Sequence, residues 1–170
     1  MNNELHSLYD SLVSVLRKEI EVYRNLHGSL VNERKILAGS FANELYENNS
    51  RKETCILKAK MVKDVRTKLL EKIINALDLD GKDIRLSTLM PHGDESQKKE
   101  LEECQSTLRS LLMKVNELSK QNKALLVSSL FYVRKSIDFF GQIISPAVTY
   151  LSTGRLKANH VNGKIVSREG

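Results

Sequence analysis

The apolar residues of segment 94–144 recur at alternating steps of three and four, and this pattern dominates the chain. Its first half consists of Leu101, Cys104, Leu108, Leu111, Val115 and Leu118. Beyond Asn122 and Leu125 it shifts by one residue and continues through Leu126, Leu130, Val133, Ile137, Phe140 and Ile144. Such spacing is typical of a long helix that packs beside other helices, and the shift suits a straight α-helix. We therefore predict one long packed helix, in which Asn122 is a buried amide that sets the register.

The ends of this helix are marked by residues that start or stop helices. A Pro-His-Gly sequence breaks any preceding helix, and Asp94 followed by Gln97 has the spacing of a capping box. Ser145 is disfavoured in a helix because a proline follows it. We therefore predict a helix that begins at Asp94 and ends near residues 141–144.

Two further long helices are predicted before it, over about residues 3–37 and 41–77. The predicted inward face of the second helix consists of Ile56, Ala59, Val62, Val65, Leu69, Ile73 and Leu77. Ser50 and Glu53 have the spacing of another capping box. The sequence therefore leaves open whether Asn48–Ser50 breaks the second helix or only bends it.

The connector and the C-terminal segment complete the predicted architecture. Residues 78–93 form a connector with room for one short helical turn at 87–90, and no stretch alternates like a β-strand. Residues 145–170 contain apolar residues too sparse for a core, so we predict a flexible tail that binds a partner. The predicted fold is all-α: an up-and-down antiparallel bundle with coiled-coil packing over residues 1–144. It has three long helices, or four if the second is broken.

Composition and charge remove several classes of function. The net charge is +6, but the basic residues of segment 58–72 spread around their helix, whereas a phosphate-binding surface gathers them on one face. We therefore predict no nucleic-acid partner. No apolar run reaches the roughly 18 residues of a membrane span, and the N-terminus opens no signal peptide. These observations predict a cytoplasmic protein without membrane insertion.

Residues with catalytic or metal-binding chemistry are scattered along the chain. The histidines are His6, His27, His92 and His160, and none has a partner at zinc-binding spacing. Cys55 and Cys104 fall in helical patterns and suit small buried hydrophobes. No Gly-rich loop could hold a phosphate. We therefore predict that the protein is not an enzyme and uses no cofactor or metal.

The end of the third predicted helix carries more apolar residues than one packed side needs. Aromatic residues at Phe131, Tyr132 and Phe139 lie on more than one face. An apolar patch of this kind is typical of a partner-binding surface, against which an amphipathic helix could lie. The candidate partner-binding residues are Ile137, Phe140, Ile143, Ile144, Val148, Tyr150, Leu151 and Leu156. The alternative is that the tail simply covers this patch.

Three segments resemble the FlgN family of flagellar export chaperones. Glu117–Leu130, with its Leu, Asn, paired Leu and Ser-Leu, is similar to the family segment that leads into a hydrophobic helix end. Ile36–Ser40 resembles the end of the family's first helix, although Ser40 stands where family members often have Asp. Tyr150–Arg155 is similar to a Tyr-x-x-x-Gly element of the family's tail.

This resemblance implies a cytoplasmic type III export chaperone without ATPase activity. Such proteins bind the C-terminal helices of hook-associated proteins, FlgK and FlgL, prevent their premature assembly and deliver them to the export apparatus. The resemblance places the binding region at the end of the third helix and in the tail. Two alternatives stay open: a structural coiled-coil protein that forms homo-oligomers, and a sibling chaperone of the FliT type. The sequence also does not decide between a monomer and a homodimer.

Overall fold

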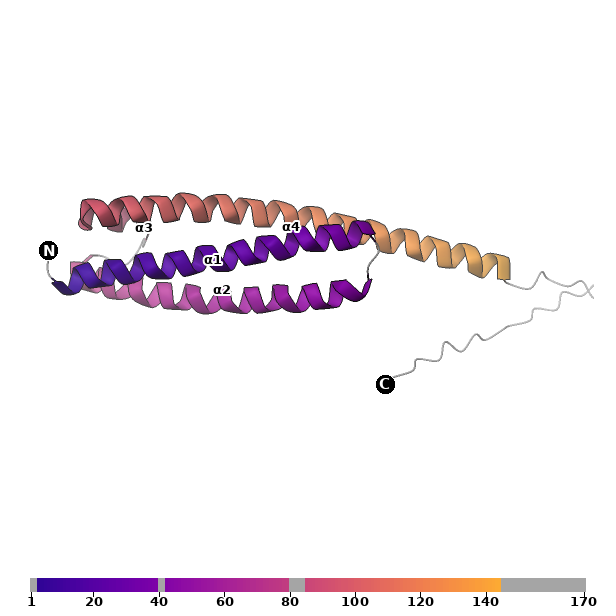
Figure 1. Ribbon diagram of the computed structural model, residues 1–170, viewed down its shortest axis with the longest axis horizontal. Coiled ribbons are helices and arrows are strands. Elements are labelled where there is room, and N and C mark those ends of the chain that lie inside the picture. Colours follow the sequence, from indigo (N-terminus) through magenta and orange to yellow (C-terminus); the bar gives the residue numbers. More distant parts are fainter. Residues whose placement is uncertain (1–2, 40–41, 80–84, 145–170) are drawn as a thin grey trace, which may run out of the picture. The chain divides into compact units, whose positions relative to one another are not determined.

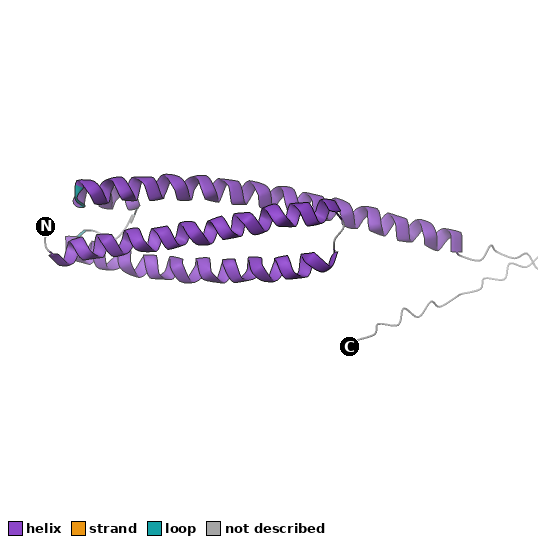
Figure 2. Cartoon of the chain, viewed as in Figure 1, coloured by secondary structure: helices purple, strands orange, loops and turns teal. Residues whose placement is uncertain are grey.

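The computed structural model describes residues 3–39, 42–79 and 85–144, apart from the side chains of Ala42 and of residues 142–144. The elements are α1 (Asn3–Gly39), α2 (Ala42–Leu77), α3 (Leu86–Leu89), the 3-10 turn η2 (Met90–His92) and α4 (Glu95–Ile144) (Figure 1). Every secondary-structure element of the described residues is helical (Figure 2). The prediction of an all-α fold is therefore confirmed.

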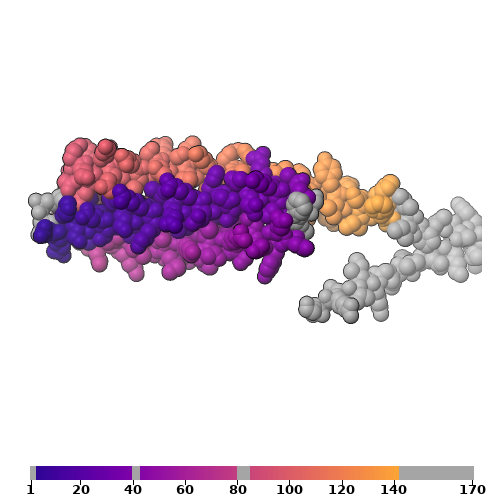
Figure 3. All heavy atoms as spheres, in the orientation of Figure 1, coloured from indigo at the N-terminus to yellow at the C-terminus, as the bar shows by residue number. Residues whose placement is uncertain are grey.

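The chain divides into two units, residues 1–126 and residues 127–170. In the first unit, α1, α2 and the N-terminal part of α4 lie side by side and alternate in direction (Figures 1 and 3). This is the up-and-down order predicted for the bundle. The described part of the second unit is the C-terminal part of α4. The predicted tail, residues 145–170, lies outside the described residues, so the predicted division after residue 144 stays a prediction.

α2 continues without a break through residues 48–50. Asn48 is only 3% exposed, and its Oδ1 accepts a hydrogen bond of 3.1 Å from Asn32 Nδ2 on α1. Asparagine often disturbs a helix by bonding to nearby backbone groups, but this side chain bonds across to another helix. Ser50 therefore does not begin a helix, and the described part of the bundle has three long helices.

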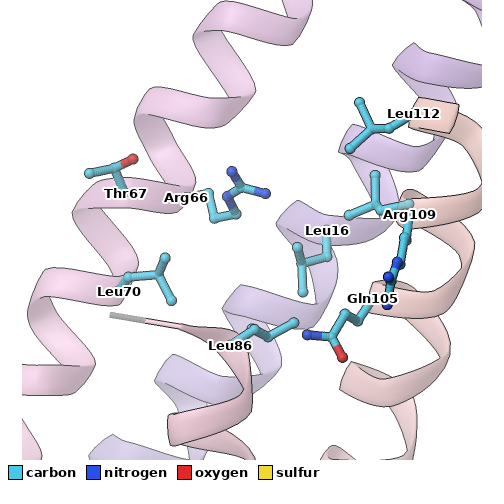
Figure 4. Close-up of a pocket in the computed structure, with 9 residues that line it drawn as sticks. Leu16, Arg66, Thr67, Leu70, Leu86, Gln105, Arg109 and Leu112 are labelled. Atoms are coloured by element: carbon cyan, nitrogen blue, oxygen red, sulfur yellow. The ribbon is translucent and has the colours of Figure 1, made fainter. Parts of the chain in front are cut away.

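The inward side of α2 differs in part from the predicted one. Ile56 and Val65 are 54% and 48% exposed, so their assignment to the inward face is wrong. Arg66 points inward instead (Figure 4), and its Nη1 donates to Glu19 Oε2 on α1 at 2.8 Å. A buried carboxylate requires such a partner, and the observed rotation of α2 supplies it. The remaining predicted residues are buried or partly buried: Ala59, Val62, Leu69, Ile73 and Leu77.

The core is closed at one end of the bundle by α3 and the residues that follow it. The most deeply buried side chains come from four helices: Tyr9, Leu12, Leu16, Ile73, Leu89 and Leu101. The hydroxyl of Tyr9 donates to Leu89 O at 2.7 Å, which satisfies a buried polar group. Gly93 lies against the same ring, since a Cβ there would come within 3.2 Å of Tyr9 Cε1. The predicted short helical turn corresponds to α3 and η2 and places Leu89 over the core.

The capping box predicted at the start of α4 is present. The Gln97 N–H donates to Asp94 Oδ1 at 2.8 Å, and the Asp94 N–H donates to Gln97 Oε1 at 3.4 Å. The amide nitrogen of Gln97 also donates to Asp10 Oδ1 at 2.7 Å and to the backbone oxygen of His6 at 3.1 Å. One side chain therefore caps α4 and attaches it to α1.

Candidate partner-binding surface

A polar network attaches α4 to α1 and α2 near the end of the first unit. Asn122 is 3% exposed, and its Nδ2 donates to Leu30 O at 2.8 Å and to Glu33 Oε2 at 2.9 Å. The other oxygen of Glu33 pairs with the ammonium group of Lys52 on α2. The predicted buried position of Asn122 is confirmed. Because its donors meet acceptors only in this alignment, the network disfavours slipped arrangements of α4.

The α4 end, which we define as residues 127–141, carries large apolar side chains that are mostly exposed. They are Val127, Leu130, Phe131, Tyr132, Val133, Ile137, Phe139 and Phe140, and their exposed fractions lie between 56% and 70%. They belong to the orange-to-yellow surface in Figure 3. In the first half of the same helix, Leu101, Cys104 and Leu108 are buried. Within the described residues, the apolar side chains of the α4 end are therefore exposed, whereas these three residues of the first half are buried.

This exposure corrects one expectation for Leu130 and Val133. Their spacing continues the packed pattern of α4, but they are 60% and 56% exposed. The three-and-four repeat continues past residue 126 with a shift of one residue, whereas the unit that contains α1 and α2 ends at that residue. A repeat reports that a side of a helix is apolar and does not report how far its neighbours extend.

Two aspects of the geometry make the α4 end suited to contact a helix. Leu130, Val133, Ile137 and Phe140 follow steps of three and four and so form one stripe along it. Neighbouring aromatic rings contact each other edge to face, with 5.9 Å between the ring centres of Phe139 and Phe140. A continuous stripe of apolar and aromatic side chains is the usual complement of an amphipathic helix.

The structure describes the side chains of two of the eight predicted binding residues. Ile137 and Phe140 are 65% and 59% exposed. Ile143 and Ile144 lie in the last turn of α4, beyond the side chains that are described. The other four lie outside the described residues: Val148, Tyr150, Leu151 and Leu156. The role of all eight in binding stays a prediction.

The described residues contain no grouping of three or more His, Cys, Asp or Glu side chains that could hold a metal ion. Cys104 is buried, and this burial raises the pKa of its thiol, so the residue serves as the small hydrophobe that was predicted. Cys55 is partly buried on α2. None of the described helices combines the length and the apolar character needed to cross a membrane.

Comparison with known proteins supplies the family. The sequence matches the family described as FlgN protein over residues 1–158, which includes the bundle and the whole of α4. No curated protein sequence and no solved structure matches the chain. The family match covers well over half of the sequence, and the three-helix bundle agrees with the fold expected from the resemblance. The chain therefore belongs to the FlgN family of flagellar export chaperones.

Proposed function

We propose that this chaperone serves hook-associated proteins similar to FlgK and FlgL. The α4 end, together with residues up to Leu156, binds the C-terminal amphipathic helices of these clients. In the cytoplasm the chaperone prevents their premature assembly and delivers them to the export apparatus, and it performs no catalysis. Membership of the FlgN family supports the chaperone role. The single observation that supports the location is the exposure of the apolar stripe on the α4 end.

The apolar stripe offers a moderate amount of binding free energy. Full burial of a side chain such as Leu, Ile or Phe contributes about 1.5–3 kcal/mol. Covering the exposed parts of Leu130, Val133, Ile137 and Phe140, about 60% of each, would then contribute about 4–7 kcal/mol. Association and side-chain ordering cost a comparable amount. Tight binding therefore requires further contacts, for which the predicted residues from Ile143 to Leu156 are the candidates.

A single exposed residue gives the sharpest test. Ile137→Ser should leave helicity and stability nearly unchanged because the side chain is 65% exposed, and it should weaken binding of a purified FlgK- or FlgL-like protein at least about tenfold. Isothermal titration calorimetry measures the affinity and circular dichroism the fold. Ile56→Ser is the matched control, since Ile56 is 54% exposed on α2 and should not affect binding.

A truncation after Pro146 tests the contribution of the C-terminal segment. It should abolish client binding while the helical circular dichroism signal stays nearly the same. Unchanged binding by both this truncation and Ile137→Ser would refute the proposed site. Failure to bind any hook-associated protein, combined with a stable oligomer in analytical ultracentrifugation, would instead favour the structural coiled-coil alternative.

A further inference from the structure

A groove between α2 and α4 lies entirely within the first unit. It encloses about 510 Å³, and five leucines from four helices line it: Leu16, Leu70, Leu86, Leu108 and Leu112 (Figure 4). Leu16 of α1 and Leu108 of α4 are 1% and 7% exposed and form its floor, whereas Leu112 at its mouth is 45% exposed. The groove is therefore an apolar recess that is open to solvent and separate from the α4 end.

The shape of this groove suits another helix. α2 and α4 are the outer helices of the described bundle, and both are attached to α1 by hydrogen bonds such as Arg66–Glu19 and Asn122–Leu30 O. A helix laid between them would meet side chains of α1, α2 and α4 as the fourth member of a bundle does. The recess has room for several side chains of the size of leucine.

The charges at the groove indicate the character of its occupant. The charged residues among its lining are two arginines, Arg66 and Arg109. Glu19 is the carboxylate paired with Arg66, at 2.8 Å. Burial raises the pKa of Glu19, and the positive charges of Arg66 and Lys63 oppose that rise. Glu19 offsets one of the two lining arginines, and the lining itself contains no carboxylate, so the groove keeps a surplus of positive charge.

The surplus of positive charge distinguishes three possible occupants of the groove: the chain's own C-terminal segment, a second copy of the chain, and a helix of another protein. The chain's own residues 145–170 carry Arg155, Lys157, Lys164 and Arg168 against Glu169, so their charge has the same sign as that of the groove. A second copy of the chain has a net charge of +6, which disfavours its approach to a positively charged groove. A partner with carboxylates beside its apolar stripe would satisfy both the leucines and the arginines.

We propose that the α2–α4 groove docks an acidic amphipathic helix of a partner protein. Apolar side chains of that helix lie against Leu16, Leu108 and Leu112, and a flanking carboxylate faces Arg109. The chain then has two separate docking surfaces, this groove and the α4 end. The inference does not depend on which protein binds the α4 end.

A designed peptide tests the groove with the full-length chain. The probe is a fluorescent helical peptide of about 20 residues with leucines at steps of three and four and glutamates on both flanks. Its matched control has lysine in place of every glutamate. Fluorescence anisotropy should show at least about tenfold tighter binding of the acidic peptide. Arg109→Glu should weaken this binding at least about fivefold and strengthen binding of the basic peptide. Leu112→Ser should weaken binding of both peptides.

Control variants on the same helix separate the groove from general effects. Lys114→Glu makes the same charge change, and Met113→Ser removes an apolar side chain that is 67% exposed, yet neither residue lines the groove. Both variants should bind the acidic peptide within about twofold of the unchanged protein. Circular dichroism confirms that each variant is folded.

Several results would overturn the proposal. Equal affinity for the two peptides would contradict the role assigned to Arg109. So would a Lys114→Glu variant that loses as much affinity for the acidic peptide as Arg109→Glu does. Tighter binding of a peptide with the sequence of residues 145–170 would identify the chain's own segment as the occupant. A dimer in analytical ultracentrifugation that dissociates with Leu112→Ser would identify a second copy. Loss of hook-protein binding with Ile137→Ser is a separate result, because Ile137 lies outside the groove.

Discussion

Replacing Asn122 with alanine should destabilise the bundle by about 2–4 kcal/mol. A hydrogen bond to a charged group contributes about 1.5–3 kcal/mol and one to a neutral group about 0.5–1.5 kcal/mol. Asn122 makes one of each, to Glu33 Oε2 at 2.9 Å and to Leu30 O at 2.8 Å. Together these contributions come to about 2–4.5 kcal/mol, and the pairing of Glu33 with Lys52, which the variant keeps, lowers the upper end of that range. Without the Asn122 amide, Oε2 of the nearly buried Glu33 carboxylate loses this hydrogen-bond donor, which destabilises the folded state.

Urea unfolding followed by circular dichroism measures this change. The urea concentration at the transition midpoint should fall, while the slope of the unfolding free energy against urea concentration should stay the same. A change of midpoint without a change of slope reports a change of stability. Asn116→Ala on the same helix is the control, since Asn116 is exposed and should alter stability by less than about 0.5 kcal/mol.

A second substitution at the same site distinguishes hydrogen bonding from packing. Asn122→Leu fills the space but removes both donors, so it should also destabilise the protein. If the leucine variant were more stable than the natural chain, the stabilising role of the Asn122 hydrogen bonds would be refuted. Apolar packing at this position would then contribute more than the two hydrogen bonds. A stability loss below about 0.5 kcal/mol with alanine would refute that stabilising role as well.

Two further predictions concern buried polar groups in the first half of α1. Tyr9→Phe removes the donor to Leu89 O and should lower the free energy of unfolding by about 1–2 kcal/mol in urea, whereas Tyr46→Phe, at a residue 84% exposed, should change it by less than about 0.5 kcal/mol. Burial raises the pKa of Glu19, so the folded state takes up this proton more readily than the unfolded state. The natural chain should therefore gain stability relative to Glu19→Gln as pH falls from neutral through the raised pKa, and lose it as pH rises. Urea unfolding of both proteins at pH 7 and at about pH 4.5 measures the difference, and an opposite trend would contradict this sign.

Local signals in the sequence were sufficient for most of the fold. The start of α4 could be predicted because Asp94 and Gln97 are three residues apart and bond to each other's backbone. Spacing of apolar residues by three and four predicted α1 and α4 for the same reason, since each helix contains its own pattern. The burial of Asn122 also followed from its place in that pattern.

Features that depend on two helices could not be predicted in this way. The rotation of α2 places Arg66 beside Glu19 of α1 and leaves Ile56 exposed. Nothing near Arg66 in the sequence indicates this carboxylate. The groove could not be predicted because Leu112 lies beside the packed repeat of α4 and is not part of it. The exposure of Leu112 depends on the space between α2 and α4. The exposure of the α4 end could not be predicted either, because an apolar repeat does not report which elements pack against it.

The position of Gln97 has a consequence for the order in which the chain folds. Its amide group reaches Asp10 and His6, which are 87 and 91 residues away in the sequence, and it also completes the cap of α4. The side chain of Gln97 therefore makes all of these hydrogen bonds only after a very long loop has closed, and loop closure carries an entropic cost. The local cap of α4 and the docking of the first turns of α1 share this one side chain. Amide hydrogen exchange in the first turn of α4 should then slow when α1 docks, beyond the protection that the local cap provides.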